Sequence, residues 1–218
     1  MSTEMITISP DACRDLAAEA FRALREGRVV ERIGRRDHTL WKPRPVEIVN
    51  RLGWLESPRV MGAALPEIQA VVHGIRGDDY RTALLLGMGG SSLAPEVFRK
   101  VFGVADGFLD LAVLDSTDPA AVLDRLESLD LKKTLFIVST KSGGTVETFS
   151  FLRFFYNRMV DACGEPEAGR HFIAITDPGS ALAQLAAQRH FRHTFLNDPE
   201  IGGRYSALSF FGLFPAAL

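Results

Sequence analysis

The chain has 218 residues, of which 46% are hydrophobic and 24% charged, and its formal net charge at pH 7 is -2. This near-neutral balance argues against a general nucleic-acid binder, and no polybasic tail indicates binding to an anionic membrane surface. The longest uncharged apolar stretch, Tyr205–Leu218, is shorter than the ~20 residues that a membrane span needs. We therefore expect a soluble globular protein with one large domain, or one domain and an appendage.

The amino terminus has no basic region followed by an apolar core, so the sequence predicts no secretory signal and a cytoplasmic location. The two cysteines, Cys13 and Cys163, lack the spacing of metal ligands. We expect both to be reduced, buried thiols, with a disulfide between them as the alternative.

The first part of the chain is predicted to be helical. Ser9 and Pro10 suit the cap and first residue of a helix that stops at Gly27. Apolar residues recur at helical spacing between these limits and form one face. That face consists of Cys13, Leu16, Ala17, Ala20, Phe21 and Leu24.

A charged segment broken by prolines follows this helix, and we expect it to wrap over the surface. The pattern predicts a short helix at Val46–Leu52 and a further one at Pro66–Ile75. The Gly77–Asp79 turn then marks a boundary near residue 80. We therefore divide the chain into a helical amino-terminal arm, residues 1–79, and a domain at residues 80–218.

After Tyr80, short apolar runs alternate with helical patterns. The middle three runs are nearly continuous, which is typical of parallel strands buried on both faces. Helices between successive strands imply right-handed crossovers, so the pattern predicts an α/β domain with a doubly wound, five-stranded parallel sheet. The predicted strands are Ala83–Leu86, Leu111–Leu114, Thr134–Val138, Phe172–Ile175 and Thr194–Leu196, and the predicted helices are Ser92–Phe102, Pro119–Leu129, Thr145–Cys163 and Ser180–Arg189.

Two loops rich in glycine and hydroxyl groups follow the first and third predicted strands, at the sheet edge where ligands bind. Each loop leads into a helix, whose unpaired N–H groups and partial positive charge favour anions such as phosphate. Glycines let the ligand approach the backbone, and the Lys141 ammonium group would add a positive charge. The loop residues are Gly87, Gly89, Gly90, Ser91 and Ser92 in the first, and Thr140, Lys141, Ser142, Gly143, Gly144 and Thr145 in the second.

Other readings of these loops remain open. Ser142 and Thr145 would, in the simplest case, only cap the following helix. Gly87 and Gly89 begin a dinucleotide fingerprint with Asp115 as the ribose-binding acid, but a serine stands where the third glycine belongs. That fingerprint leaves the second loop unexplained, so a phosphate held between both loops is favoured.

A third stretch, "DPEIGGRYSALSFFGL", places Arg204 after a Gly-Gly turn and before an apolar helix. An arginine there does not belong in a core unless it is paired. The alternative to a functional role is a salt bridge with Asp198 or Glu200.

Together the three stretches resemble the phosphoglucose isomerase family. "GMGGSSLAP", "TKSGGTVET" and "IGGRYSALSFFGL" are similar, in order and spacing, to three of its signature loops. The resemblance implies that residues 80–218 form the family's first sugar isomerase (SIS) domain, a flavodoxin-like sandwich. The segment "DHTLWKPRPVEIVNRLGWL" resembles the isomerase part of bifunctional transaldolase–phosphoglucose isomerase chains.

The resemblance also implies an activity, the interconversion of glucose 6-phosphate and fructose 6-phosphate through a cis-enediolate. It implies no metal and no cofactor. Arg204 would stabilise the enediolate, and Glu147 would orient a ring-opening histidine unless it merely complements the helix dipole. The sugar phosphate would be held by Ser91, Thr140, Ser142 and Thr145 and by the backbone of Gly90 and Lys141.

This sequence departs from the family pattern at Thr140, Gly144 and Ala94, where the family usually has serine, threonine and glycine. In the family a second SIS domain supplies the base, the histidine and a lysine, and from the resemblance we expect this chain to lack that domain. We therefore expect a fragment without isomerase activity of its own, which binds a sugar 6-phosphate, and a homodimer is left open. A patch of exposed apolar residues is expected at its end, formed by Leu208, Phe210, Phe211, Leu213, Phe214 and Leu218.

Two alternatives to an isomerase remain. Isolated SIS domains also serve as non-catalytic sugar-phosphate sensors, although Arg204 in its Gly-Gly-Arg setting favours the enzyme. An NAD-binding domain is the third reading, disfavoured by Ser92 and by the unexplained second loop.

Overall fold

The structure is a computed structural model that describes residues 11–218. The chain divides into two compact units, Met1–Val49 and Asn50–Leu218. Within the described part of the first unit lie α1 (Asp11–Glu26), α2 (Val29–Gly34) and a 3-10 turn, His38–Leu40. The helix predicted to stop at Gly27 does so, whereas its predicted cap at Ser9 and Pro10 lies outside the described residues.

The prediction of buried thiols is wrong for Cys13, which is exposed, while Cys163 is half-buried, and both are free. Cys13 is exposed because the apolar face of α1 is uncovered within its own unit, where Leu16 and Phe21 are 67% and 69% exposed. Partial burial raises the pKa of the Cys163 thiol.

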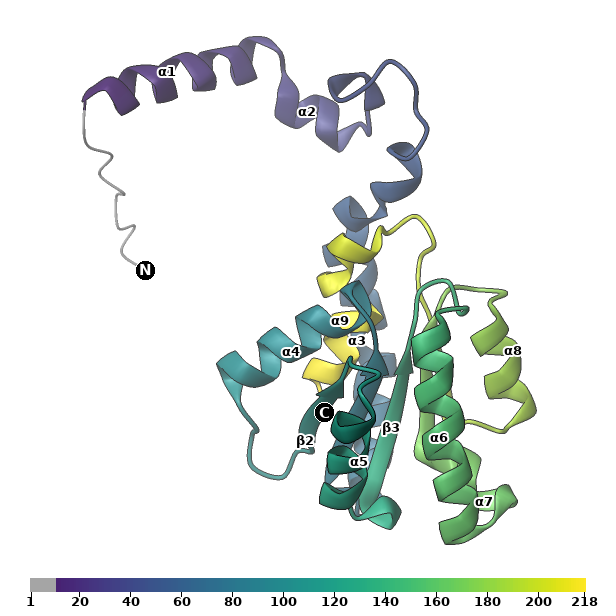
Figure 1. Ribbon diagram of the computed structural model, residues 1–218. Coiled ribbons are helices and arrows are strands. Elements are labelled where there is room, and N and C mark those ends of the chain that lie inside the picture. Colours follow the sequence, from purple (N-terminus) through teal and green to yellow (C-terminus); the bar gives the residue numbers. More distant parts are fainter. Residues whose placement is uncertain (1–10) are drawn as a thin grey trace. The chain divides into compact units, whose positions relative to one another are not determined.

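The second unit is built on a five-stranded, all-parallel sheet in the order β2-β1-β3-β4-β5 (Figure 1). This confirms the predicted doubly wound α/β fold, and the strand order is the one found in flavodoxin-like sheets. The strands are β1 (Thr82–Gly87), β2 (Asp110–Leu114), β3 (Thr134–Ser139), β4 (Phe172–Thr176) and β5 (His193–Leu196). The helices that connect them are α4 (Gly90–Phe102), α5 (Pro119–Ser128), α6 (Val146–Cys163), α7 (Glu165–Ala168) and α8 (Ala181–Gln188).

Alternate residues of each central strand face opposite sides of the sheet. On β3, Leu135 and Ile137 pack into a cluster with α3 (Ser57–Gly77) and α9 (Phe210–Ala216). Phe136 and Val138 pack into a second cluster with α5, α6 and α8. Both faces of the sheet are therefore buried, which explains the nearly continuous apolar runs of the central strands.

Helix α3 belongs to the sheet unit, so the unit boundary lies at residue 50 and not at the expected residue 80. The reason is that α3 buries Ile68, Val72 and Ile75 against the sheet. The helix is also longer than predicted, because Ser57 and Pro58 begin it and Pro66 is accommodated inside it.

Two further expectations about this unit are wrong. The short helix expected at Val46–Leu52 is replaced by 3-10 turns at Val49–Arg51 and Gly53–Glu56. The expected exposed patch does not form either, because α9 packs on the α3 face of the sheet. Phe210, Phe211, Phe214 and Leu218 are buried there, whereas Leu208 is exposed.

Among the described residues, no helix has both the length and the apolar character to cross a membrane.

Candidate functional site

The two predicted loops lie side by side at the point where the strand order reverses. Strand β1 has β2 on one side and β3 on the other, and Gly87 at its end pairs with Ser139 at the end of β3. In open parallel sheets the crevice beyond such a reversal is the usual ligand site. A side chain at Gly87 would place its Cβ 3.0 Å from the Ser139 carbonyl oxygen, so the close approach favours glycine here.

The first loop is fastened to the end of β3. Gly89, with φ 57°, turns the chain into α4, which begins at Gly90. The Ser139 hydroxyl group donates a hydrogen bond to the carbonyl oxygen of Ser91 (3.1 Å). Ser91 itself is buried, and its N–H donates to the carbonyl oxygen of Met88 (3.2 Å), while the N–H groups of Ser92 and Leu93 donate to that of Gly89 (both 3.0 Å). These bonds hold the first loop tightly against the start of α4 and leave the Gly90 N–H as the first-turn donor that could face an anion.

The second loop carries its hydroxyl groups close together before α6. The hydroxyl oxygens of Thr140 and Thr145 are 2.9 Å apart, and the Gly144 N–H donates to the Ser142 hydroxyl oxygen (3.3 Å). Thr145 occupies the N-cap position of α6 but makes no side-chain capping hydrogen bond. The simple capping explanation therefore does not account for Thr145.

The second loop also packs on the turn between β4 and α8. Gly143 has φ 62°, and a Cβ there would lie 2.4 Å from Ser180 Cβ. The Ser180 hydroxyl oxygen accepts a hydrogen bond from the Ala183 N–H and lies 2.8 Å from the Thr176 hydroxyl oxygen. The second loop therefore packs against Ser180, and hydrogen bonds fix the Ser180 side chain.

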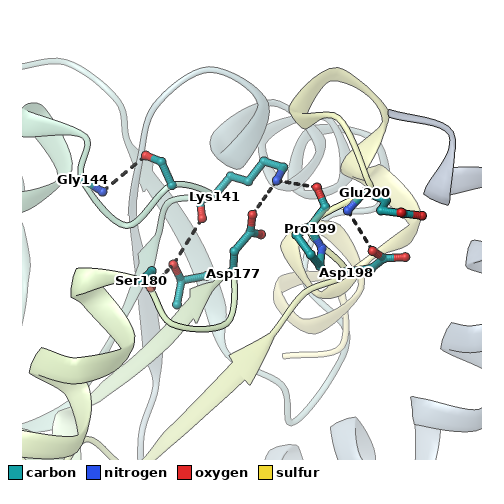
Figure 2. A network of polar contacts seen from close by, with 9 residues as sticks. Lys141, Gly144, Asp177, Ser180, Asp198, Pro199 and Glu200 are labelled. Atoms are coloured by element: carbon teal, nitrogen blue, oxygen red, sulfur yellow. Dashed lines mark hydrogen bonds and ion pairs between the residues drawn. The ribbon is translucent and has the colours of Figure 1, made fainter. Parts of the chain in front are cut away.

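The sequence suggested that the Lys141 side chain adds a free positive charge to the second loop. The structure differs, because this charge is paired. Figure 2 shows its ammonium group between the Asp177 carboxylate, with Nζ 2.5 Å from Oδ2, and the Pro199 carbonyl oxygen, 2.9 Å away. Asp177 pairs with this charge, so the Lys141 ammonium group is not a free cation in the second loop.

Asp177 is a residue that the sequence analysis missed. It follows β4 at the same edge of the sheet as the two loops, which is the signal that would have found it. Burial raises the pKa of its carboxyl group, while the hydrogen bond from Lys141 opposes that rise. One carboxylate oxygen, Oδ1, is buried without a hydrogen-bond partner among the described residues.

The third stretch meets the first loop. A Cβ at Gly90 would lie 2.3 Å from the Gly203 carbonyl oxygen, so the two backbones are in direct contact. The Ser206 hydroxyl oxygen lies 2.7 Å from the carbonyl oxygen of Gly203 and 3.3 Å from that of Gly90. Arg204 follows in the 3-10 turn Gly203–Leu208, exposed, and it forms no ion pair within residues 50–218. The salt bridge considered from the sequence is therefore not formed there.

Two other residues complete the comparison with the sequence. Glu147 lies in the first turn of α6, where its negative charge complements the helix dipole. Asp115, the ribose-binding candidate of the dinucleotide reading, lies with one carboxylate oxygen 3.4 Å from the hydroxyl group of Ser92. Ser92 is buried, and its hydroxyl group also donates to the Gly89 carbonyl oxygen. This hydrogen bond stabilises the first loop on its buried side.

Comparison with known proteins gives a consistent result. A family model described as phosphoglucose isomerase matches residues 62–218. A glucose-6-phosphate isomerase of Thermus thermophilus is 34% identical over 173 residues, which cover 76% of this chain and 39% of that protein. The glucose-6-phosphate isomerase of a Cyanothece species is 38% identical over 150 residues, 67% of this chain and 28% of that protein.

Solved structures agree with these relatives. A hypothetical protein from Thermus thermophilus is similar over 94% of this chain and 47% of its own, with a TM-score of 0.73 and 30% identity. A glucose-6-phosphate isomerase from Chlamydia trachomatis is similar over 68% of this chain and 28% of its own, with a TM-score of 0.60 and 26% identity. The chain thus spans less than half the length of the relatives it matches.

Proposed function

The chain belongs to the phosphoglucose isomerase family, and from this we propose that it carries the phosphate-binding half of a glucose-6-phosphate isomerase site. The observation that carries the proposal is the meeting of three loops at one edge of the sheet. The loops after β1 and β3 adjoin through Gly87 and Ser139, and the Arg204 turn adjoins the first loop through Gly90.

In this proposal the substrate phosphate lies at the starts of α4 and α6. Two helix amino termini supply backbone N–H groups and partial positive charge, and the nearby hydroxyl groups add donors. The proposal assigns no phosphate contact to the Lys141 ammonium group, because that group pairs with Asp177. The proposed contacts are the side chains of Ser91, Thr140, Ser142 and Thr145 and the backbone of Gly90 and Lys141.

The reaction that we propose for the whole protein is proton transfer between C2 and C1 of the open-chain sugar. Arg204 would face the oxygens of the enediolate, and its exposure without an ion pair within residues 50–218 leaves its guanidinium group available. A fixed charge directed at a transition state is typically worth ~3–4 kcal/mol. Glu147 would orient the ring-opening histidine.

The general base and that histidine would come from a second SIS domain. The support for this step is the length of the relatives, of which this chain covers 39% or less in the two cases compared. Removal of a general base typically costs about 10²–10⁴-fold in rate. We therefore propose that this chain binds sugar phosphates but does not isomerise them at a measurable rate.

Calorimetric titration of the chain with fructose 6-phosphate, and with NAD in a parallel cell, tests the proposal. Saturable binding of fructose 6-phosphate, lost in a Ser142→Ala/Thr145→Ala double variant, is the expected result. A Ser150→Ala variant on the exposed side of α6 is the matched control and should bind like the parent. Binding of NAD alone would overturn the proposal and return Gly87 and Gly89 to a dinucleotide site.

A further inference from the structure

The ion pair between Lys141 and Asp177 joins two parts of the site that are far apart in the sequence. Lys141 belongs to the second loop, and the same ammonium group also donates to the Pro199 carbonyl oxygen, in the segment that leads to Arg204 (Figure 2). We refer to the Lys141, Asp177 and Pro199 contacts as the loop bridge.

The loop bridge is more enclosed than the ion pair of Lys133 with Asp79. The side chains of Lys141 and Asp177 are 24% and 15% exposed, whereas those of Lys133 and Asp79 are 36% and 70% exposed. Solvent screens an enclosed pair less, and loss of one partner leaves the other charge poorly solvated. Removal of one partner of the loop bridge should therefore cost more than removal of one partner of a typical surface salt bridge.

The segment that receives the bridge is held from its other side as well. The Gly53 N–H donates to the Glu200 carbonyl oxygen (3.1 Å), and Leu52 forms an isolated antiparallel bridge with Ile201. These contacts join residues 200 and 201 to the 3-10 turn that precedes α3, and the loop bridge joins Pro199 to the second loop. The position of the Gly-Gly turn before Arg204 depends on both.

We propose that Asp177 is a positioning residue that, through Lys141, sets the distance between the phosphate-binding loop and Arg204. This inference rests on the proposed function. A six-carbon sugar phosphate presents its phosphate at one end and the reacting C1–C2 atoms at the other, so both ends bind together only if the two protein parts have the right spacing. A small displacement of such groups can cost about 100-fold in catalysis.

The test compares two ligands on the whole chain. Inorganic phosphate engages only the loop end, whereas 5-phosphoarabinonate adds a carboxylate whose two oxygens resemble those of the enediolate. For Asp177→Asn we expect at least a tenfold loss of affinity for 5-phosphoarabinonate and no loss for phosphate. Asp177→Glu, which keeps the carboxylate, should recover part of the loss, and Asp79→Asn, in the exposed pair, should change neither affinity.

A double-mutant cycle separates positioning from general damage. If Asp177 acts through Arg204, Asp177→Asn should have no further effect on 5-phosphoarabinonate binding in an Arg204→Ala background. Equal losses for both ligands, or full additivity with Arg204→Ala, would overturn the proposal. So would unchanged affinities.

A ligand-free measurement keeps the inference separable from the proposed function. In Asp177→Asn, the amides of Glu200–Tyr205 should exchange hydrogen at least tenfold faster than in the parent, while α6 amides should not change. Unchanged exchange overturns the positioning role, whatever the ligands do. If the parent binds neither ligand but the exchange changes as expected, the proposed function fails and the bridge as a loop-holding contact stands.

Discussion

Gly90 shows how one residue without a side chain brings two parts of the site together. A Cβ at this position would lie 2.3 Å from the Gly203 carbonyl oxygen and 2.7 Å from its carbonyl carbon. These are backbone atoms, so a larger residue cannot be accommodated by turning a side chain. The contact between the first loop and the Arg204 turn therefore requires glycine at residue 90.

A Gly90→Ala variant should lower the free energy of unfolding by about 1–3 kcal/mol, the usual cost of overpacking. Urea unfolding followed by circular dichroism measures it. Gly62→Ala is the matched control, because Gly62 is exposed in α3 and a Cβ there meets nothing within 4 Å. It should raise stability by about 0.5–1 kcal/mol, through the better helix propensity of alanine. A Gly90→Ala protein as stable as its parent would contradict the close contact.

At the scale of elements, His171 connects strands at their amino-terminal ends, which lie opposite the candidate site. This residue precedes β4, and its Nδ1 donates to the carbonyl oxygen of Thr134 at the start of β3 (3.1 Å). Its ring also makes an edge contact with Tyr80, which precedes β1, at 5.3 Å between centroids. The imidazole group of a residue that precedes β4 therefore contacts residues at the beginnings of two other strands, β1 and β3.

His171 gives the unit a predictable pH dependence. Burial lowers the pKa of His171 below its ordinary value of 6.5, although its hydrogen bond to Thr134 opposes the change. The unfolded chain therefore binds the proton more readily, so this contribution to stability is complete above pH 6.5 and is lost as the pH falls through the folded-state pKa. Neighbouring charges on this ring come from Arg192, Glu167 and Arg170.

Urea unfolding at several values from about pH 7.5 to about pH 5, on either side of the ordinary histidine pKa, measures this effect. A His171→Gln variant, which keeps a donor for Thr134 but does not titrate, should lose less stability over this range than the parent. His73→Gln, at an exposed position of α3, should follow the parent curve. Parallel curves for His171→Gln and the parent would refute the assignment.

At the scale of the whole molecule, the sheet and the described apolar residues that pack on its two faces belong to the unit of residues 50–218. Both clusters of buried apolar residues draw their members from Met61 onward. Helix α3 supplies four of them, Met61, Ile68, Val72 and Ile75. A division of the chain at residue 80 would remove this cover from one face of the sheet.

We therefore expect a chain of residues 50–218 to unfold cooperatively and a chain of residues 80–218 not to fold. Burial of four large apolar side chains contributes about 6–12 kcal/mol, which is comparable with the whole stability of a domain, about 5–15 kcal/mol. Near-ultraviolet circular dichroism and urea unfolding of both chains measure the difference. A cooperative transition of the shorter chain at the parent midpoint would show that α3 is dispensable.

The sequence by itself determined the strands, the connecting helices and the two loops after β1 and β3. These features depend on local patterns: continuous apolar runs for strands buried on both faces, helical spacing between them, and glycines where the chain must turn sharply. The Gly-Gly turn before Arg204 was visible for the same reason. The right-handed crossovers follow from the alternation of parallel strands and helices.

Only the tertiary structure decided which surfaces meet and which charges pair. The sequence could not show that α9 buries Phe214 beside α3, because an apolar helix face looks the same whether or not a partner covers it. Nor could it show that Lys141 turns to Asp177 and Pro199, which are 36 and 58 residues away. Charge pairing in a folded chain depends on distances between segments remote in sequence, and those distances exist only once the sheet has assembled.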